Sequence, residues 1–582
     1  MRACERFARA RCFIPAYIIF WFAWFTWVQT IGRIHGGLSL TSVLAFDAVF
    51  AFFAWKLLRN GVNNSSGTNI TPSLRSLFSE LPAWLRALLV AAGATLLFTA
   101  VFQVPLDWDG MDYHLPPIVE SWQDGFWHRS AQPYFAARSY PKTASALALW
   151  WLAHFGSVLG LRLLLVPPLL HWCAGLAASL ELVGGNKWVL LLWAAYPLAA
   201  RESAAWYADL AGLSALLCFL ALLKRERYVL AALALALHGS TKFSNLATAG
   251  GALIALNLYW AVSERKIMTA RRAALNALLA VPLLLVAAVQ PLQNLRAGDG
   301  PFGPLKCAVL GRDPCGGTLD PDDLVVAPIV SDYERSDSWV KKIARGWTPS
   351  QLVPGSDVST GGFGWAWLPA CAFGLAALAR RRMRDAAPWA LLSIAVVFAA
   401  DLAMRAHWYA RFHMPLGWAL GMFAAVTLQG LEAEHRARAA RVLIPLTLAL
   451  AGFQIAWLVP HRTWFLGAGQ GPPLANVVDN IGSIVARGYP AHATNPADVR
   501  SLKLFPLEKK RIVVCGEHLR PILPAYGARL TNRVEWHDAE EEGARSRDWG
   551  LTPCPRPEAP PEEKFEETSY RVLATGDGLY KF

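Results

Sequence analysis

The chain has 582 residues, of which 54% are hydrophobic and 17% are charged, and its mean hydropathy is +0.31. Soluble domains carry roughly a quarter charged residues, so this composition excludes an ordinary soluble protein. Apolar runs near the length needed to cross a ~30 Å hydrocarbon core recur along the chain. The formal net charge of +13 does not indicate nucleic-acid binding. Much of it stands in short Lys and Arg clusters between apolar runs, as in the cytoplasmic loops of membrane proteins.

The first apolar run follows a basic N-terminus and extends from about Cys12 to Ile31. It is long for the core of a signal peptide and no clear cleavage site ends it, which predicts a retained first helix with a cytoplasmic start. With the later runs, the sequence predicts about thirteen crossing helices. Their expected ranges are 12–31, 38–57, 84–104, 161–181, 188–200, 206–223, 228–240, 244–262, 273–290, 364–379, 387–404, 414–430 and 441–459.

The basic clusters indicate how these helices are oriented. With a cytoplasmic N-terminus and about thirteen crossings, clusters such as 224–227 and 380–384 all fall inside. The same count places Asp109, the loop 291–363 and everything after about residue 460 outside. The segment 143–158 is apolar enough to be a further crossing, which would break this order. We expect it to lie along the membrane or to re-enter it on the outer side.

The predicted fold is therefore an all-α polytopic membrane protein with a small α/β domain outside the membrane. Residues 1–104, 161–290 and 364–459 hold the transmembrane helices. The outer parts are 105–160, the loop 291–363 and the C-terminal domain 460–582. The loop is too long to be only a connector. In the C-terminal domain, residues 511–516 are typical of a buried strand.

Nine cysteines are distributed over the apolar and polar parts of the chain. Most lie in or beside apolar runs, where cysteine behaves as a small core residue. If the outer regions face an oxidising compartment, two disulfides can form there. The candidates are Cys307 and Cys315 in the outer loop, and Cys515 and Cys554 in the C-terminal region. No spacing of Cys and His predicts a zinc site.

Three acids, Asp107, Asp109 and Asp112, stand at the outer end of the predicted helix 84–104. An acid at a bilayer interface is costly to remove from water, which makes this segment a candidate functional site. The alternative is a solvated loop. Asp109 and Asp112 are three residues apart and share a face if the loop is helical. One ionised carboxylate can then act as a general base, while repulsion raises the pKa of the other.

Other candidates in the first outer region are His114, Tyr140 and Lys142. His114 can orient an acid or bind a phosphate, or it is a hydrogen-bonded structural histidine. Lys142 can meet an anionic head group, or it only extends its ammonium group to the interface.

Further candidates lie at the predicted outer ends of later helices. Asp209 can bind substrate, although an acid there also suits the helix dipole. Lys242, flanked by small and hydroxyl residues, can bind a phosphate. Asn294 and Arg296 open the large outer loop. A last cluster suits a phosphate-binding wall, although each member alone can be an interfacial anchor; it consists of Arg405, His407, Tyr409 and Arg411.

The order of these motifs resembles the GT-C glycosyltransferases, which take a sugar from a polyprenyl-phosphate carrier. The similarity is greatest to bacterial lipid-A aminoarabinose transferases and rhizobial lipopolysaccharide core transferases, and extends to glycosyltransferase family 39. The residues that carry it are 108–116, Tyr140-Pro141, 207–210, 241–244, 294–296, 298–305, 361–364, and 409–412 with Pro415. The C-terminal segments 511–516, 526–527 and 532–534 also resemble a small extracytoplasmic domain of some members.

The resemblance implies roles for individual residues. Asp109 corresponds to the essential acid of the first outer loop, with Asp112 second. Lys242 and Arg411, with Arg296 behind them, correspond to the phosphate contacts. This chain departs from the family in three ways. Two helices precede the acidic loop instead of one, Lys142 stands where a second proline is common, and the acids are Asp-x-x-Asp rather than adjacent Asp-Glu.

The resemblance implies an inverting glycosyltransferase of the bacterial inner membrane with its active site facing the periplasm. The donor would be a sugar on undecaprenyl phosphate or a similar lipid. The acceptor would be lipopolysaccharide, another glycan or a protein outside the cytoplasm. No cofactor is required, and although the acids can bind a divalent metal, no ligand spacing demands one. Membrane lipids are expected partners and nucleic acid is not. Two alternatives are a transporter or flippase of a lipid-linked saccharide, which predicts inverted repeats and midplane charges, and a non-catalytic assembly subunit.

Overall fold

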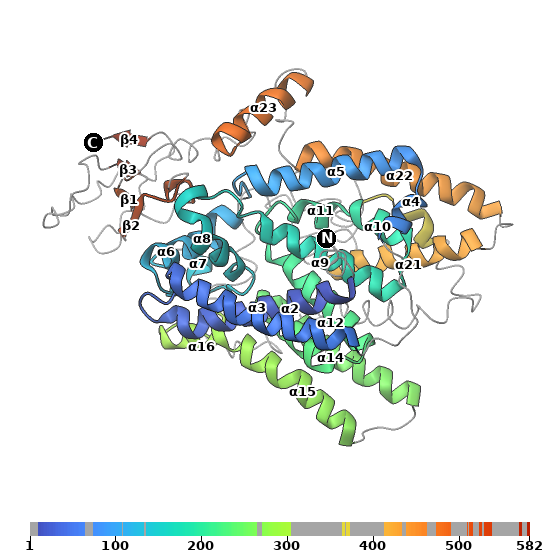
Figure 1. Cartoon of the computed structure of the whole chain (residues 1–582), viewed down its shortest axis with the longest axis horizontal. Helices are drawn as coiled ribbons and strands as arrows, with labels where there is room; N and C mark the ends of the chain where they lie inside the picture. The colour runs from blue at the N-terminus through green and yellow to red at the C-terminus, as the bar shows by residue number, and fades with distance from the viewer. Residues whose placement is uncertain are drawn as a thin grey trace, which may run out of the picture.

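A computed structural model of the whole chain shows a long helical body with a small sheet at one end (Figure 1). The structure describes residues 10–63, 74–107, 109–132, 135–264, 270–303, 364–366, 368–372, 413–433, 438–462, 473–489, 509, 511–515, 523–526, 529–537, 570–572 and 579–581.

The helices of the first half follow one another with short connections. They are α2 (Ala10–Thr30), η1 (Ile31–Arg33), α3 (Leu40–Asn63), α4 (Leu74–Ser79), α5 (Ala83–Phe102), η2 (Gly110–His114), α6 (Pro116–Asp124), α7 (Phe135–Ser139), α8 (Ala146–Leu159), α9 (Val166–Val183), α10 (Lys187–Ala194), α11 (Pro197–Glu202), α12 (Ala208–Lys224), α13 (Tyr228–Thr241), α14 (Phe243–Glu264), α15 (Ala270–Ala287) and α16 (Val289–Arg296). The later elements are α21 (Met414–Ala433), α22 (Arg438–Arg462), α23 (Pro473–Arg487), η4 (Leu523–Tyr526) and strands β1 (Arg511–Cys515), β2 (Arg533–His537), β3 (Tyr570–Val572) and β4 (Leu579–Lys581).

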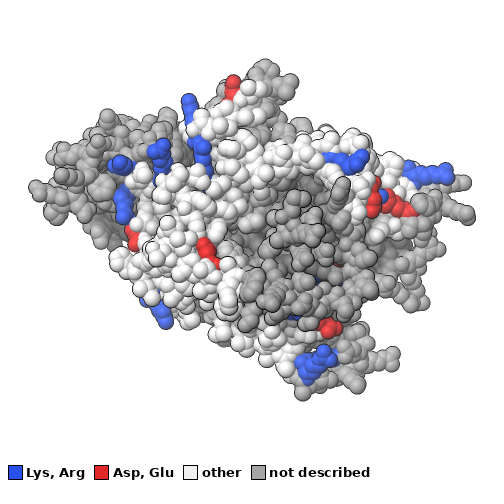
Figure 2. Space-filling model, in the orientation of Figure 1, with Lys and Arg blue, Asp and Glu red and all other residues white. Residues whose placement is uncertain are grey.

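The protein is a multi-pass membrane protein. Within the described residues, five helices are long and apolar enough to cross a bilayer: Phe13–Arg33, Ala83–Phe102, Val166–Val183, Arg271–Arg296 and Met414–Glu432. Shorter apolar helices accompany them. In Figure 2, most charged side chains of the described residues lie towards the two ends of the long axis. The mostly helical, membrane-spanning fold agrees with the prediction, whereas the count of about thirteen crossings is not established.

One predicted helix is broken. The range 188–200 forms α10 and α11, separated at Tyr196, which has extended backbone angles (φ −73°, ψ 108°). Pro197 explains the break, because proline disfavours a helical conformation in the residue before it. The eight residues of α10 extend only about 12 Å, which is too short for a crossing of its own. The predicted crossings 364–379 and 387–404 lie largely outside the described residues.

The centre of the bundle is α12. Its residues from Leu210 to Leu223 are all buried, as expected for a helix that is apolar on every side. It packs against α9 and α13, and α13 packs in turn against α15. The first turn of α12 therefore has a fixed position at the outer end of the core, and this turn carries Asp209.

The ambiguous segment 143–158 forms the helix α8. Its 14 residues extend about 21 Å, less than a full crossing. The indole nitrogens of Trp21 and Trp24 in α2 donate hydrogen bonds to the carbonyls of Thr143 and Ala146, at 2.9 and 2.6 Å. These bonds hold the beginning of α8 against the side of a crossing helix.

The described strands of the C-terminal region form one sheet in the order β2-β1-β3-β4. β1 is parallel to both β2 and β3, while β3 and β4 are antiparallel. The predicted strand 511–516 corresponds to β1. The sheet lies at the same end of the molecule as α6, α7 and α8 (Figure 1).

Candidate functional site

The acidic loop is a tight turn between α5 and α6. After α5 the chain runs without regular structure to Asp107 and then forms the π-helical turn η2; such turns are frequent at functional sites. The amide of Gly110 donates a 2.7 Å hydrogen bond to Oδ2 of Asp107. A Cβ atom at Gly110 would collide with this carboxylate and come within 2.8 Å of Cβ of Trp206. Only glycine fits this close approach.

The three acids differ in exposure. Asp112 is fully buried and Asp107 is 7% exposed, whereas Asp109, at the N-terminal end of η2, is only partly buried. The backbone carbonyl of Asp112 accepts a 2.9 Å hydrogen bond from Nε2 of Gln132. Of the two predicted catalytic acids, Asp109 is therefore the one placed to reach a substrate.

Asp107 is a buried acid whose importance the sequence did not single out. Burial raises its pKa to about 7, and the charge of Asp109 acts in the same direction, while backbone hydrogen bonds from Trp206 and Gly110 act against it. The raised carboxyl pKa in this loop is thus that of Asp107, and its main cause is burial rather than repulsion between two acids.

The acidic loop lies against the beginning of α12. Trp206 touches Gly110, and Asp209 follows three residues later in the first turn of α12. Oδ1 of Asp209 accepts a 2.8 Å hydrogen bond from Nζ of Lys242, and the two side chains are 8% and 25% exposed. The structure therefore unites two predicted site residues in one ion pair, next to the acidic loop.

A row of aromatic rings connects the same parts by a second route. The ring of Tyr113 in η2 meets the ring of Tyr140 at 5.7 Å between centroids. Tyr140 meets Phe243, the neighbour of Lys242, at 6.0 Å, and Phe243 meets Phe302 at 5.0 Å. Motifs almost 200 residues apart in the chain thus share one corner of the molecule.

Lys142 is part of the scaffold of this corner. Its side chain is 6% exposed, and Nζ donates hydrogen bonds to the carbonyls of Tyr113 and Ala136 at 2.9 and 3.1 Å. Burial lowers the pKa of Lys142 to about 7, and the nearby Glu120 counteracts this shift. Its amine reaches into the protein, so it does not extend to the interface as one interpretation of the sequence suggested.

Asn294 and His114 are also buried. Nδ2 of Asn294 donates to the carbonyls of Ser139 and Pro301, both at 3.1 Å, and its Oδ1 accepts from Gln290 at 2.9 Å. These bonds tie α16 and the following turn to α7. Nδ1 of His114 lies 3.5 Å from Oγ of Ser145, and its ring contacts that of Tyr113. Both residues shape the corner from within the protein.

Arg296 lies at the exposed C-terminal end of α16. The other predicted cations, Arg405 and Arg411, lie outside the described residues, as do His407 and Tyr409. Cys307, Cys315 and Cys554 are also outside them, and Cys515 is the last residue of β1. Among the residues that the structure describes, no group of three or more His, Cys, Asp or Glu side chains could hold a metal ion.

A cavity opens beside the aromatic row. It is a narrow space of about 10 Å³ between α2, the loop after α7, and the ends of α13 to α16. Most of its wall is apolar, and Lys142, Ser240, Phe243 and Gln290 are among the lining residues. The corner therefore combines a partly exposed acid, a partly exposed cation and a small apolar-walled space.

No protein-family model matches the chain, and no curated protein matches it. Two crystal structures of ArnT from Cupriavidus metallidurans are similar in fold. The apo structure has a TM-score of 0.47 and 15% sequence identity, over 78% of this chain and 85% of that chain. The structure bound to undecaprenyl phosphate has a TM-score of 0.46 with the same identity and coverage. A TM-score below 0.5 is too low to assign a function, which therefore depends on the residues of the site.

Proposed function

We propose that the protein is a membrane glycosyltransferase that moves a sugar from a polyprenyl-phosphate carrier to an acceptor outside the cytoplasm. The observation that carries this proposal is the convergence of Asp109, the Lys242–Asp209 ion pair and the row from Tyr113 to Phe302. The described motifs at 109–116, 140–141, 207–210, 241–244 and 294–303 thus lie in one corner of the molecule. A base and a cation in one site suit transfer from an anionic leaving group.

Asp109 is proposed as the general base. Its carboxylate takes the proton from the acceptor hydroxyl or amine as that group attacks the anomeric carbon of the sugar. The bond between the anomeric carbon and the carrier phosphate breaks in the same displacement, and the phosphate leaves with its electron pair. One displacement inverts the configuration at this carbon.

Lys242 is proposed to stabilise the departing phosphate. The side chain of Lys242 is 25% exposed, and its ammonium nitrogen lies 2.8 Å from Oδ1 of Asp209. The Asp209 carboxylate holds the lysine in place at the end of α13. Arg296 and Arg411 are proposed as further phosphate contacts.

The proposed location is the bacterial inner membrane with the site facing the periplasm. This orientation rests on the basic clusters of the sequence, which the positive-inside rule assigns to the cytoplasmic side. The acceptor is proposed to be a glycan, lipid or protein of the cell envelope. The chemistry needs no cofactor.

The test compares wild type, Asp109→Asn and Asp124→Asn in detergent or lipid vesicles, with a panel of undecaprenyl-phosphate sugars and membrane-derived acceptor. Release of the carrier is followed. We expect turnover in wild type and in Asp124→Asn, which removes an acid 34% exposed on α6, but a loss of at least about a hundredfold in Asp109→Asn. Equal turnover in Asp109→Asn would move the base to another residue. Absence of turnover with every donor would contradict the enzyme.

One observation favours the transporter alternative. Nε2 of His154 in α8 lies 2.7 Å from Oδ2 of Asp47 in α3, and Nε1 of Trp150 donates to the other oxygen of Asp47 at 2.9 Å. Asp47 lies seven residues after Leu40, the first residue of α3, which is about 10 Å along this helix. Both α3 and α8 are apolar helices, so the pair lies between apolar elements. Ionisable residues at such depth often serve transport. Movement of a labelled lipid-linked sugar across vesicles without sugar transfer would support this alternative.

A further inference from the structure

The C-terminal region docks on α6, the helix that directly follows the acidic loop. Three side chains of α6 make the contact. Nε2 of Gln123 donates to the carbonyls of Leu530 and Asn532 at 2.8 and 2.9 Å. Oδ1 of Asp124 pairs with Nη1 of Arg533 at 2.7 Å. Glu120 pairs with Tyr526, as described below. Residues more than 400 positions apart in the chain thus meet on α6, which begins seven residues after Asp109.

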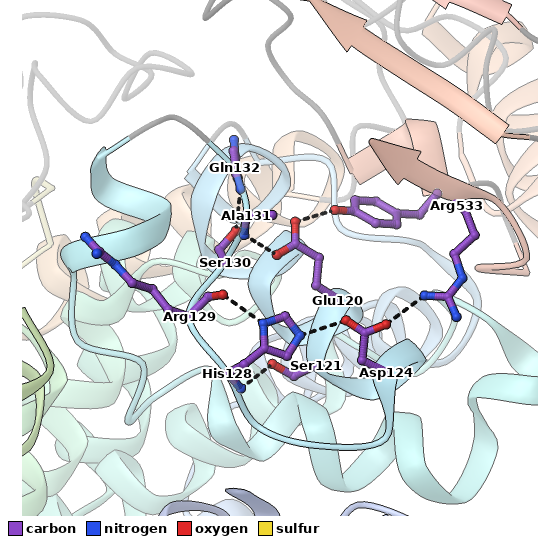
Figure 3. Close-up of polar contacts among 10 residues, drawn as sticks. Glu120, Ser121, Asp124, His128, Arg129, Ser130, Ala131, Gln132 and Arg533 are labelled. Atoms are coloured by element: carbon purple, nitrogen blue, oxygen red, sulfur yellow. Dashed lines mark hydrogen bonds and ion pairs between the residues drawn. The ribbon is translucent and has the colours of Figure 1, made fainter. Parts of the chain in front are cut away.

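Glu120 and Asp124 lie on the same helix but in different surroundings (Figure 3). Glu120 is 8% exposed; its Oε1 accepts a 2.8 Å hydrogen bond from the hydroxyl of Tyr526, and its Oε2 accepts a 3.2 Å bond from the amide of Ala131. Asp124 and Arg533 are 34% and 51% exposed. Both acids bind the C-terminal region and a residue of the loop after α6: Asp124 pairs with His128 at 2.9 Å, and the buried Glu120 accepts from the amide of Ala131.

The segment bound by Glu120 leads to the acidic loop. Ala131 is followed by Gln132, which is 2% exposed and donates from Nε2 to the carbonyl of Asp112 at 2.9 Å. Nε of Arg138 holds the carbonyl of Gln132 at 2.6 Å. Glu120 thus bonds both Tyr526 and the amide of Ala131, and the next residue, Gln132, bonds the backbone of η2. These three hydrogen bonds connect the C-terminal region to the acidic loop.

The hydroxyl of Tyr526 is suited to be a permanent donor in this series. It is buried, and burial together with the charges of Glu120 and Asp124 raises the pKa of Tyr526 well above its usual value. The hydroxyl therefore keeps its proton. Because a buried carboxylate that loses a donor is costly, the contact favours one docked position of the C-terminal region.

We propose that Tyr526 and Glu120 are positioning residues through which the docked C-terminal region holds the acidic loop in its active geometry. Gln132 supplies a hydrogen bond to the backbone of η2 from outside the turn, at the carbonyl of Asp112. The C-terminal region acts here as a brace for Asp109. The catalytic part of this proposal rests on the proposed function, while its structural part does not.

The first test measures hydrogen exchange of the full chain in detergent without substrate. Tyr526→Phe removes only the hydroxyl, and Arg533→Gln removes the exposed docking contact as a matched control. Loss of one buried hydrogen bond corresponds to about a fivefold change in local opening. We expect Tyr526→Phe to speed exchange of amides in 110–114 and 131–132 by about this factor, and Arg533→Gln to change it less than about twofold. Equal effects of both variants, or none at 110–114, would overturn the brace.

The second test uses sugar transfer. We expect Tyr526→Phe, Glu120→Ala and Gln132→Leu each to lower kcat by about three- to tenfold with the KM for the lipid-linked donor unchanged. Glu120→Gln should retain most activity, because its amide oxygen can accept from Ala131 while its nitrogen donates to the Tyr526 oxygen.

A double variant separates a shared path from general weakening. Tyr526→Phe combined with Gln132→Leu should be no slower than about the slower single variant, since both interrupt the same series. Multiplied losses, or a rise in KM in place of a fall in kcat, would overturn the positioning role. If wild type transfers no sugar, the proposed function fails, and the exchange measurement still decides whether Tyr526 braces η2.

Discussion

Two lysines at the outer end of the bundle, Lys142 and Lys242, occupy opposite environments. Lys142 is 6% exposed, and its ammonium group donates to the carbonyls of Tyr113 and Ala136. Lys242 is 25% exposed and pairs with the carboxylate of Asp209. Both were candidates for an anionic substrate. The comparison teaches that backbone carbonyls can enclose one cation within the scaffold, while a carboxylate holds another at a partly exposed position.

The largest effect should follow from Lys242→Met. The proposed reaction loses the cation beside the departing phosphate, so we expect carrier release to slow by about a hundredfold or more. Stability should change by less than about 1 kcal/mol, because the ion pair is partly exposed. Steady-state transfer and thermal unfolding in detergent measure the two quantities. Unchanged transfer would remove Lys242 from the site.

The second effect is a pH dependence of the free energy of unfolding, which we expect from the buried groups of this corner, beginning with Asp107. An unfolded Asp titrates near pH 4 and Asp107 in the fold near 7, so the folded state binds more protons between these values. Stability should therefore fall as pH rises from about 4 to about 7, by on the order of a few kcal/mol.

Lys142 should give the opposite slope at higher pH. Its pKa is about 7 in the fold and about 10.4 when unfolded, so the unfolded state binds more protons and stability should rise between these values. Unfolding of Asp107→Asn and Lys142→Met across this pH range measures each contribution. A slope that persists in the respective variant would assign it to other groups.

Lys142→Met should lower stability by about 1–3 kcal/mol, because the carbonyl of Tyr113 loses its buried donor. The carbonyl of Ala136 is affected less, since it also accepts from the amide of Tyr140. We expect transfer by the folded fraction to stay within about a fewfold of wild type. Normal stability with lost transfer would show instead that Lys142 contacts the substrate.

Asp209→Asn should have the smallest effect. It removes the partner of Lys242 and an acid in the first turn of α12, which together are worth about 1 kcal/mol. The freed lysine keeps its charge, so transfer should change far less than in Lys242→Met. The same assays measure this variant. A loss as large as that of Lys242→Met would give Asp209 a direct role in catalysis.

The sequence predicted much of the scaffold. Helices expected at 84–104 and 228–240 correspond within about two residues to α5 and α13. A run of apolar residues indicates a buried or lipid-facing helix whichever elements it packs against, so these helices could be predicted without the tertiary structure. The prediction of one helix over 188–200 was wrong, although Pro197 carries the signal for a break, since a residue before proline avoids the helical conformation. The sequence further placed Asp109 and Asp112 together beyond the end of a crossing helix.

Tertiary structure alone decided which groups are accessible and which are paired. The amino-acid order does not reveal that Trp206 lies on Gly110, that Lys242 meets Asp209, or that Tyr526 reaches Glu120. These contacts depend on how distant helices pack, as does the burial that raises the pKa of Asp107. Hydropathy along the chain determines the class of the protein, whereas a site depends on partners that meet only when the bundle is assembled.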